Sequence, residues 1–260
     1  MQLRPKKSLG QNFLIDKNIL KKIVDIGGIN KNDKILEIGP GTGNLTEYIV
    51  RSKSKNITIV EKDTNLVKIL KEKFKENIKI INYDVLKLSE SFYKDEFIVY
   101  GNLPYNISTQ ILAYWCLSKN IKFKKLILLF QKEVADRIVA EVNTKNYSRI
   151  TILANWKFNI KKILDLNPEC FSPRPKIKST LLEFTPKNKI IEIKSPKNLE
   201  NITKIFFNQR RKMVKKNFIK LFKNFNDVSK SVNINLSDRP QNISVEKFLM
   251  IVKKFEDELK

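Results

Sequence analysis

Residues 34–44 read KILEIGPGTGN, a short apolar run followed directly by a glycine-rich turn. The apolar run predicts a buried strand, and the pattern that continues through Leu45, Tyr48 and Ile49 predicts a helix. Glycines let the backbone of such a turn approach a ligand, and the helix N-terminus presents unpaired N–H groups. A glycine loop can also serve as a simple connection, so its surroundings decide what it indicates.

Strand-like and helix-like segments alternate on both sides of this unit. Strands are predicted at residues 34–39, 56–63, 77–84, 96–102 and 124–130, and helices at residues 16–26, 64–76, 108–118 and 131–142. This alternation predicts an α/β fold with a mostly parallel sheet and helices on both faces. Residues 149–158 and 177–186 read as two more strands, which would form an antiparallel edge.

The strand pattern stops near residues 186–196. Residues 195–225 and 244–260 are amphipathic helical stretches with no strand candidate between them. We therefore predict two domains, an α/β domain in residues 1–190 and a small all-helical domain in residues 191–260.

Composition excludes several classes of protein. The chain has 260 residues and no histidine, so His-based acid–base catalysis, a Ser-His-Asp triad and His-ligated metals are excluded. Cys116 and Cys170 match no disulfide framework or metal spacing, and we expect no metal site. No apolar run approaches the roughly 20 residues of a membrane span, and none follows the basic N-terminus as in a secretory signal. We expect a cytoplasmic protein without membrane contact. We also expect a monomer, because the sequence shows no apolar stripe that would form a subunit interface.

The formal net charge of +24 suggests an anionic partner such as nucleic acid. Of the 51 basic residues, 43 are Lys, which drift in an AT-rich genome would also produce, so their placement matters more than the total. Residues 204–223 contain eight basic residues and no acidic one. We predict a helix here with Phe206, Phe207, Phe218 and Phe222 packed inward. The candidate RNA-binding residues are Arg210, Arg211, Lys212, Lys215 and Lys216. A helix that is merely well solvated would have a similar composition.

The glycine loop departs from the dinucleotide fingerprint, because the third glycine position falls on Asn44. The pattern is instead E-x-G-x-G-x-G. Glu61 ends the second predicted strand, where an acid can accept both hydroxyls of a ribose, and Asp84 ends the third, where it could hold an adenine amine. Either acid alone is better explained as a solvated strand end or a helix cap. Together with the loop, at the carboxyl ends of successive strands, they favour a nucleoside-containing cofactor.

These residues resemble the S-adenosylmethionine site of Rossmann-like methyltransferases. The resemblance implies that the glycine loop, with Gly39 and Gly41, approaches the amino-acid end of the cofactor. It also implies that Glu61 binds the ribose and Asp84 the adenine amine.

The turn NLPY at residues 102–105 resembles the [D/N]-P-P-[Y/F] motif of enzymes that methylate exocyclic amines of bases. The lone pair of adenine N6 is delocalised into the ring. Two acceptors aimed at the N–H bonds of this amine would make the lone pair available for reaction. They are the side-chain oxygen of Asn102 and the backbone carbonyl of Leu103. Pro104 would fix the turn, and Tyr105 would stack on the base for about 1–3 kcal/mol. No strong base is needed, because the amine loses its proton only after methyl transfer. A base in a helix would have to be extruded, unless it is already single-stranded. Phe171 is our candidate for a second aromatic wall, although taken alone it is better explained as a core residue.

The wider sequence is similar to the small-subunit (16S-type) ribosomal RNA adenine N6,N6-dimethyltransferase family. SLGQNFL, EIGPGTGNLT, YGNLPYNIST, QKEVADR, FSPRPKIKST and FNQRRKMVKKNF occur in that family's order, from about Lys7 to the C-terminal helices. The resemblance implies that QNFL lies across the cofactor, with Asn12 and Leu14 as contacts, and the position of Asn102 adds it to the cofactor-binding residues. It implies dimethylation of two adjacent adenosines near the 3′ end of the small-subunit rRNA, within an assembling small subunit. One departure is Tyr147-Ser148-Arg149, where the family usually has Tyr-Gly-Arg.

Three alternatives remain open at this stage. Large-subunit rRNA dimethyltransferases of the macrolide-resistance type share QNFL and N-[IL]-P-Y, although the C-terminal motifs are similar to the small-subunit enzymes. A non-catalytic RNA-binding assembly factor could keep the cofactor fold. A nicotinamide-dependent oxidoreductase is disfavoured by Asn44 and by the missing acid–base residue.

Overall fold

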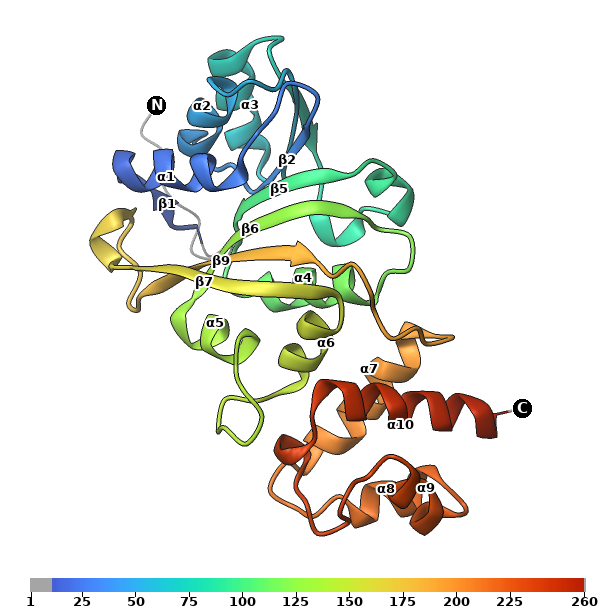
Figure 1. The fold of residues 1–260 in the computed structure, drawn as a ribbon. Coiled ribbons are helices and arrows are strands. Elements are labelled where there is room, and N and C mark those ends of the chain that lie inside the picture. Colours follow the sequence, from blue (N-terminus) through green and yellow to red (C-terminus); the bar gives the residue numbers. More distant parts are fainter. Residues whose placement is uncertain (1–10, 260) are drawn as a thin grey trace. The chain divides into compact units, whose positions relative to one another are not determined.

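The computed structural model describes residues 11–259, and its main feature is a seven-stranded sheet (Figure 1). The strands in spatial order are β4 (Lys79–Asn82), β3 (Asn56–Glu61), β2 (Lys34–Ile38), β5 (Phe97–Asn102), β6 (Phe123–Gln131), β9 (Ser179–Pro186) and β7 (Phe158–Leu166). Neighbours from β4 to β6 are parallel, and β9 pairs with β6 in the antiparallel sense. The predicted mostly parallel sheet with an antiparallel edge is confirmed.

Three helices pack on one face of this sheet, namely α1 (Lys17–Gly27), α2 (Asn44–Val50) and α3 (Thr64–Phe74). The carboxylate of Asp16 caps α1 by accepting from the N–H groups of Asn18 and Ile19, and Gly28 ends the helix at φ 60°. Strand side chains on this face, such as Ile59 and Ile98, are buried with the helices. Residues on the opposite face are equally buried, as expected for a parallel sheet covered on both sides: Leu36, Val99, Leu126 and Leu128.

One predicted strand is wrong. Residues 149–157 form the helix α6 (Arg149–Lys157), and the strand follows at β7. Ser148 and Thr151 form a capping box, and Ser148 is extended at φ −156°, so the turn needs no glycine. The helix is buried almost all round, with Ile152, Leu153 and Trp156 no more than 4% exposed, so it lacks the apolar stripe of an amphipathic helix.

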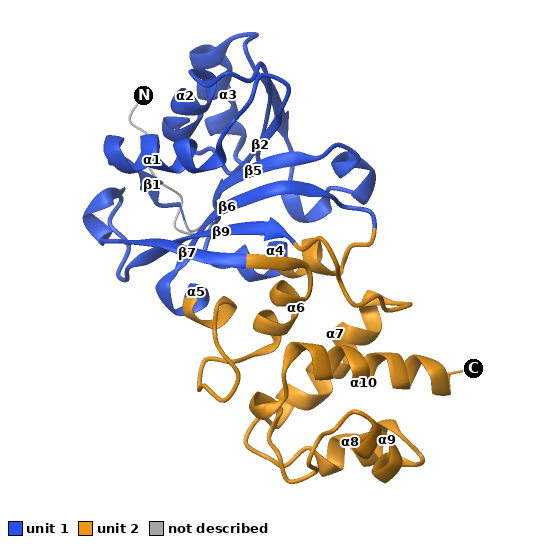
Figure 2. Ribbon diagram, in the orientation of Figure 1, with its two compact units in different colours: residues 1–112, 120–135, 160–186 blue, residues 113–119, 136–159, 187–260 orange. Residues whose placement is uncertain are grey.

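The chain divides into two compact units (Figure 2). Unit 1 comprises residues 1–112, 120–135 and 160–186, and unit 2 comprises residues 113–119, 136–159 and 187–260. Unit 1 holds the carboxyl ends of β2 to β5, where the predicted cofactor residues lie. The remaining helices of the sheet region are α4 (Ser108–Leu117) and α5 (Lys132–Ile138).

Unit 2 includes the C-terminal helices α7 (Pro196–Asn208), α8 (Lys215–Leu221), α9 (Phe225–Ser231) and α10 (Val245–Glu258). A cluster of aromatic rings forms its core, with Phe206 5.8 Å from Phe218 and 5.3 Å from Phe248 between ring centroids. Phe206, Phe218 and Phe222 are at most 3% exposed, as predicted, whereas Phe207 is half-buried. No helix in residues 11–259 has the length and apolar character that crossing a bilayer requires.

The single basic helix predicted for residues 204–223 is wrong. The helix α7 ends at Asn208, and a turn separates it from α8. Long-range hydrogen bonds hold this turn: the N–H of Val214 donates to the Asp238 carbonyl at 2.8 Å, and that of Lys215 to the Leu236 carbonyl at 3.1 Å. These contacts outweigh the local helical tendency of the basic segment.

Candidate active site

The predicted cofactor residues meet at the carboxyl ends of four adjacent strands. In the register of the sheet, Ile38 at the end of β2 lies beside Val60 of β3 and Gly101 of β5. The chain runs from β2 outward to β3 and β4, then returns to the other side of β2 as β5. A topological switch point of this kind is where open α/β sheets bind their ligands.

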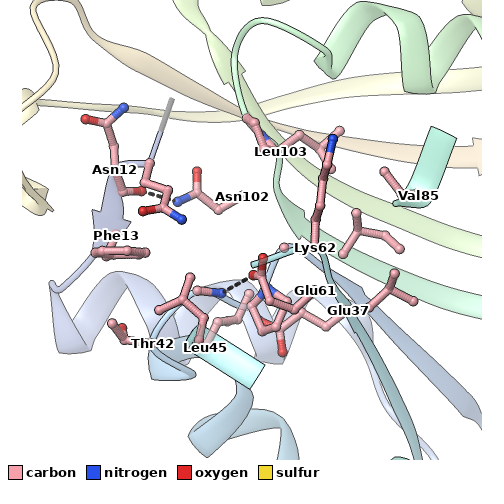
Figure 3. Close-up of a pocket in the computed structure, with 18 of the residues that line it drawn as sticks. Asn12, Phe13, Glu37, Thr42, Leu45, Glu61, Lys62, Val85, Asn102 and Leu103 are labelled. Carbon is pink, nitrogen blue, oxygen red and sulfur yellow. Dashed lines mark hydrogen bonds between the residues drawn. The ribbon is translucent and has the colours of Figure 1, made fainter. Parts of the chain in front are cut away.

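A cavity of about 220 Å³ opens at this edge of unit 1 (Figure 3). It is lined by residues of the N-terminal segment, the glycine loop, the ends of β3 and β4, and the NLPY turn. Every predicted cofactor residue and the whole NLPY turn are among them: Asn12, Leu14, Gly39, Gly41, Glu61, Asp84, Asn102, Leu103, Pro104 and Tyr105. Their roles in binding and catalysis stay a prediction.

The glycine loop has a conformation that side chains other than glycine rarely adopt. Gly39 and Gly41 have φ values of 67° and 60°. A Cβ atom on Gly41 would lie 2.6 Å from Cδ1 of Phe13, so glycine is what allows the Phe13 ring to cover the loop. A Cβ on Gly39 would meet nothing closer than 3.9 Å, so its positive φ is the reason for glycine there. At Gly39 the loop therefore exposes backbone to a ligand, whereas at Gly41 the Phe13 ring covers it.

Two buried carboxylates lie under the loop. Glu61 is 7% exposed, and its oxygens accept from the N–H groups of Gly41 at 3.2 Å and Asp63 at 2.8 Å. Burial raises the pKa of Glu61, while these two hydrogen bonds act against the increase. Glu37 is 2% exposed, and the Thr46 hydroxyl donates to it at 2.6 Å. Burial raises the pKa of Glu37 to about 8, and the nearby charge of Glu61 contributes to the increase. The pocket thus has acceptors for hydroxyl and ammonium groups.

Asp84 lies at the end of β4 and is already engaged on both oxygens. It accepts from the N–H of Leu86 at 3.0 Å and forms an ion pair with Lys62 at 2.9 Å. The hydrogen bond from Lys62 lowers the pKa of Asp84. An adenine amine would therefore share or replace the contact that the 60% exposed Lys62 now makes.

The NLPY turn presents polar groups to the same cavity. The side-chain amide of Asn102 donates to the backbone carbonyl of Asn12 at 2.7 Å (Figure 3). Tyr105 is half-buried, and its hydroxyl hydrogen-bonds with the fully buried Ser179 at 2.7 Å. Leu103 is buried in the core, so only its backbone can act on a ligand. The turn combines a fixed amide with a fixed aromatic ring.

Phe171 does not line this cavity. It lies in the short strand β8 (Phe171–Ser172), which pairs with β1 (Phe13–Leu14), and it is 3% exposed in the hydrophobic core. In this structure Phe171 therefore does not form a wall of the cavity, and its role as a second aromatic wall stays a prediction. Its backbone pairs with that of Leu14.

Several residues of the cavity were not among the predicted site residues, notably Phe13, Glu37, Lys62 and Tyr83. Phe13 and Glu37 occur inside the quoted motifs QNFL and EIGPGTG, so their position was the available signal. Tyr83 is 46% exposed and directly precedes Asp84, which places an aromatic ring beside the predicted adenine site. Among the described residues, no group of three or more Cys, Asp or Glu is arranged to hold a metal.

The predicted RNA-binding residues lie in unit 2 and differ in exposure. Arg211, Lys212, Lys215 and Lys216 are exposed, whereas Arg210 is half-buried. The guanidinium of Arg210 donates to the Lys145 carbonyl and, at 3.3 Å, to Gln241 Oε1. Arg210 thus holds the turn after α7 against two other segments of unit 2, and four basic side chains remain on the surface.

Comparison with known proteins places the chain in a family. The family model of the ribosomal RNA adenine dimethylases matches residues 2–257. The Ribosomal RNA small subunit methyltransferase A of Pelagibacter ubique (strain HTCC1062) is 55% identical over 260 residues, covering 99% of both chains. The protein of the same name from Malacoplasma penetrans (strain HF-2) is 41% identical, covering 96% of this chain and 92% of its own.

Solved structures show the same architecture. A dimethyladenosine transferase from Plasmodium falciparum superposes with a TM-score of 0.82 at 26% identity, covering 95% of this chain and 98% of its own. The 23S rRNA methyltransferase ErmE, with a TM-score of 0.70 and 21% identity, covers 94% of this chain and 99% of its own and shares the fold. With a family model over nearly its whole length and close relatives of one name, the chain belongs to the ribosomal RNA adenine dimethylase family.

Proposed function

We propose that the protein transfers methyl groups from S-adenosylmethionine to N6 of two adjacent adenosines near the 3′ end of the small-subunit (16S) rRNA. The product is N6,N6-dimethyladenosine, formed during biogenesis of the small subunit. The observation that carries this proposal is the meeting of the NLPY turn with the glycine loop and Glu61 in one cavity.

The residues that line the cavity suit the cofactor in their chemistry. The backbone of Gly39 is open to close approach, and the buried carboxylate of Glu61 lies at the same end of the cavity. Asn12, Leu14 and Asp84 complete the set of residues that would hold S-adenosylmethionine. When bound, this cofactor supplies a methyl group made electrophilic by its sulfonium.

The residues of the turn prepare the amine. The Asn102 amide oxygen and the Leu103 carbonyl accept from the two N–H bonds of adenine N6, which favours a more tetrahedral nitrogen with an available lone pair. Tyr105 offers a ring face for the base, and its hydroxyl is fixed by Ser179. Stacking of this kind is worth about 1–3 kcal/mol per base. None of these groups needs to act as a strong base.

The RNA partner is gripped outside this cavity as well. In the helical domain that we expect in residues 191–260, the exposed Arg211, Lys212, Lys215 and Lys216 would neutralise phosphates. We infer that the partner is an assembling small subunit, that the enzyme acts as a monomer, and that it works in the cytoplasm, where ribosomes assemble. The relatives named after the small subunit favour this substrate over large-subunit rRNA.

The test is methyl transfer from labelled S-adenosylmethionine to unmethylated small subunits, with naked rRNA and large-subunit rRNA in parallel. After digestion to nucleosides, N6,N6-dimethyladenosine should appear in the small-subunit sample, and the variant Asn102→Ala should form it only at a slow residual rate. Product on large-subunit rRNA would overturn the substrate assignment. Cofactor binding by calorimetry without any product would indicate an assembly factor instead.

A further inference from the structure

The N-terminal segment that covers the cavity is held from two sides. We call residues 11–15 the strap. On one side, Phe13 pairs with Ser172 and Leu14 with Phe171, and the N–H of Ile15 donates to the Cys170 carbonyl at 2.8 Å. This pairing is only two residues long, so by itself it is a weak attachment.

Two asparagines hold the other side of the strap. The amide of Asn44 donates to the Leu14 carbonyl at 2.8 Å, and the amide of Asn102 donates to the Asn12 carbonyl at 2.7 Å. In an extended chain, the carbonyls of residues two apart point the same way, so one edge of the strap offers both acceptors. Asn44 opens α2 and Asn102 ends β5, so the two donors come from the elements that flank the switch point.

The bond to Asn12 fixes which way the amide of Asn102 faces. A side-chain amide donates through nitrogen and accepts through oxygen. Because the nitrogen of Asn102 points at the Asn12 carbonyl, its Oδ1 faces elsewhere, and none of the described residues donates to it. A flipped amide would set Oδ1 against the carbonyl of Asn12, which is a repulsive contact between two acceptors. The strap therefore leaves Oδ1 of Asn102 available to accept a hydrogen bond from an N–H group of a bound ligand.

We propose that Asn44 is a positioning residue for methyl transfer: it clamps the strap, and the clamped strap orients the Asn102 amide toward the target amine. This inference rests on the proposed function. Asn44 also lines the cavity, but its side-chain amide donates to the strap backbone, and in this proposal its effect on transfer passes through the strap and Asn102.

Two substitutions remove the hydrogen bond from Asn44 to the strap, one with an apolar side chain and one with a charged side chain. Asn44→Leu has a similar size but no donor, and Asn44→Asp has the same shape, no donor and a negative charge. An acid is favourable in the first turn of a helix, so Asn44→Asp should not weaken α2. The matched control is Asn155→Leu, which removes amide-to-carbonyl bonds to Ile138 and Thr151 in unit 2, outside the cavity.

The first readout is hydrogen exchange of the strap, measured without RNA or cofactor. Both Asn44 variants should speed exchange of the peptide that covers residues 11–16, whereas Asn155→Leu should not. Unchanged strap exchange in both Asn44 variants would overturn the clamp. This readout stands even if the unaltered protein transfers no methyl group, a result that would instead refute the proposed function.

The second readout is the single-turnover rate of methyl transfer at saturating cofactor and RNA. Each Asn44 variant should lose about tenfold in rate, the equivalent of roughly one net hydrogen bond, with no comparable loss for Asn155→Leu. On an Asn102→Ala background, Asn44→Leu should change the residual rate by less than about twofold, because the group that it positions is gone. A full tenfold loss on that background would show that Asn44 acts independently of Asn102 and would overturn the proposal.

Discussion

Glu37 offers a direct test of how this site balances stability against binding. It is 2% exposed, and burial raises its pKa to about 8 from the ordinary value of 4.5. A carboxyl whose folded-state pKa is raised binds its proton more tightly in the folded protein than in the unfolded chain. Its contribution to stability is therefore present at acid pH and is lost as pH rises from 4.5 toward 8.

The substitution Glu37→Gln keeps an acceptor for the Thr46 hydroxyl and removes the charge. One pKa unit corresponds to about 1.4 kcal/mol, so between pH 5 and pH 8 the unaltered protein should lose about 3 kcal/mol relative to the variant. Urea unfolding of both proteins at pH 5, 6, 7 and 8 measures this difference. The variant should be close to the unaltered protein at pH 5 and clearly more stable at pH 8.

The control is Glu72→Gln on the exposed side of α3, which should leave the pH dependence of unfolding unchanged. If the stability gain from Glu37→Gln were the same at pH 5 and pH 8, the ionisation of Glu37 would not be its cause, and the reasoning would fail. Above pH 8, where Glu37 is ionised, the same variant should bind S-adenosylmethionine more weakly by calorimetry, because the cavity loses a carboxylate that can face the ammonium of the cofactor. A group that lowers stability and serves binding is a common feature of functional sites.

Five further substitutions probe other parts of the protein. Gly41→Ala should weaken cofactor binding at least tenfold by calorimetry, because its Cβ would lie 2.6 Å from Phe13 and its φ is 60°; retained affinity would contradict the described loop. Tyr105→Phe and Ser179→Ala each remove the hydrogen bond that fixes the ring, so they should cause similar, modest losses in kcat. Tyr105→Ala should lower kcat a further ten- to hundredfold, because stacking worth about 1–3 kcal/mol is lost. Equal effects of Tyr105→Phe and Tyr105→Ala would argue against stacking. Arg211→Ala should lower RNA affinity and reduce the slope of log affinity against log salt by about one, with cofactor affinity unchanged; an unchanged slope in filter binding would remove Arg211 from the RNA contact.

The sequence was sufficient for the parallel part of the sheet and for the place of the site. Strands β2 to β6 are short apolar runs bounded by turns, and helices α1 and α3 have clear apolar stripes. Glu61 and Asp84 could be assigned to one edge because parallel strands end on the same side. Periodicity and topology together determine these features.

The sequence misled where packing outweighs local pattern. The apolar residues of 149–157 are buried all round, so a short helix there shows no period that separates it from a strand. The break after α7 depends on partners more than 20 residues away, the carbonyls of Leu236 and Asp238. The pairing of β1 with β8, which brings the backbone of Phe171 beside Leu14, could not be predicted, because each strand is only two residues long.

The chemistry of the site explains why a chain without histidine can carry out this reaction. The groups at the NLPY turn are an amide, a peptide carbonyl and a phenol, and burial raises the pKa of Tyr105 further above neutrality. In the mechanism that we propose, the orientation of the Asn102 amide, and not the protonation state of a catalytic base, makes the amine reactive. Glu37 is the cavity carboxyl whose pKa is raised into the neutral range, to about 8, and it lies under the glycine loop rather than at the turn. A pH dependence of the reaction near neutrality should therefore follow cofactor affinity and disappear at saturating cofactor, since the groups that meet the amine do not change charge there.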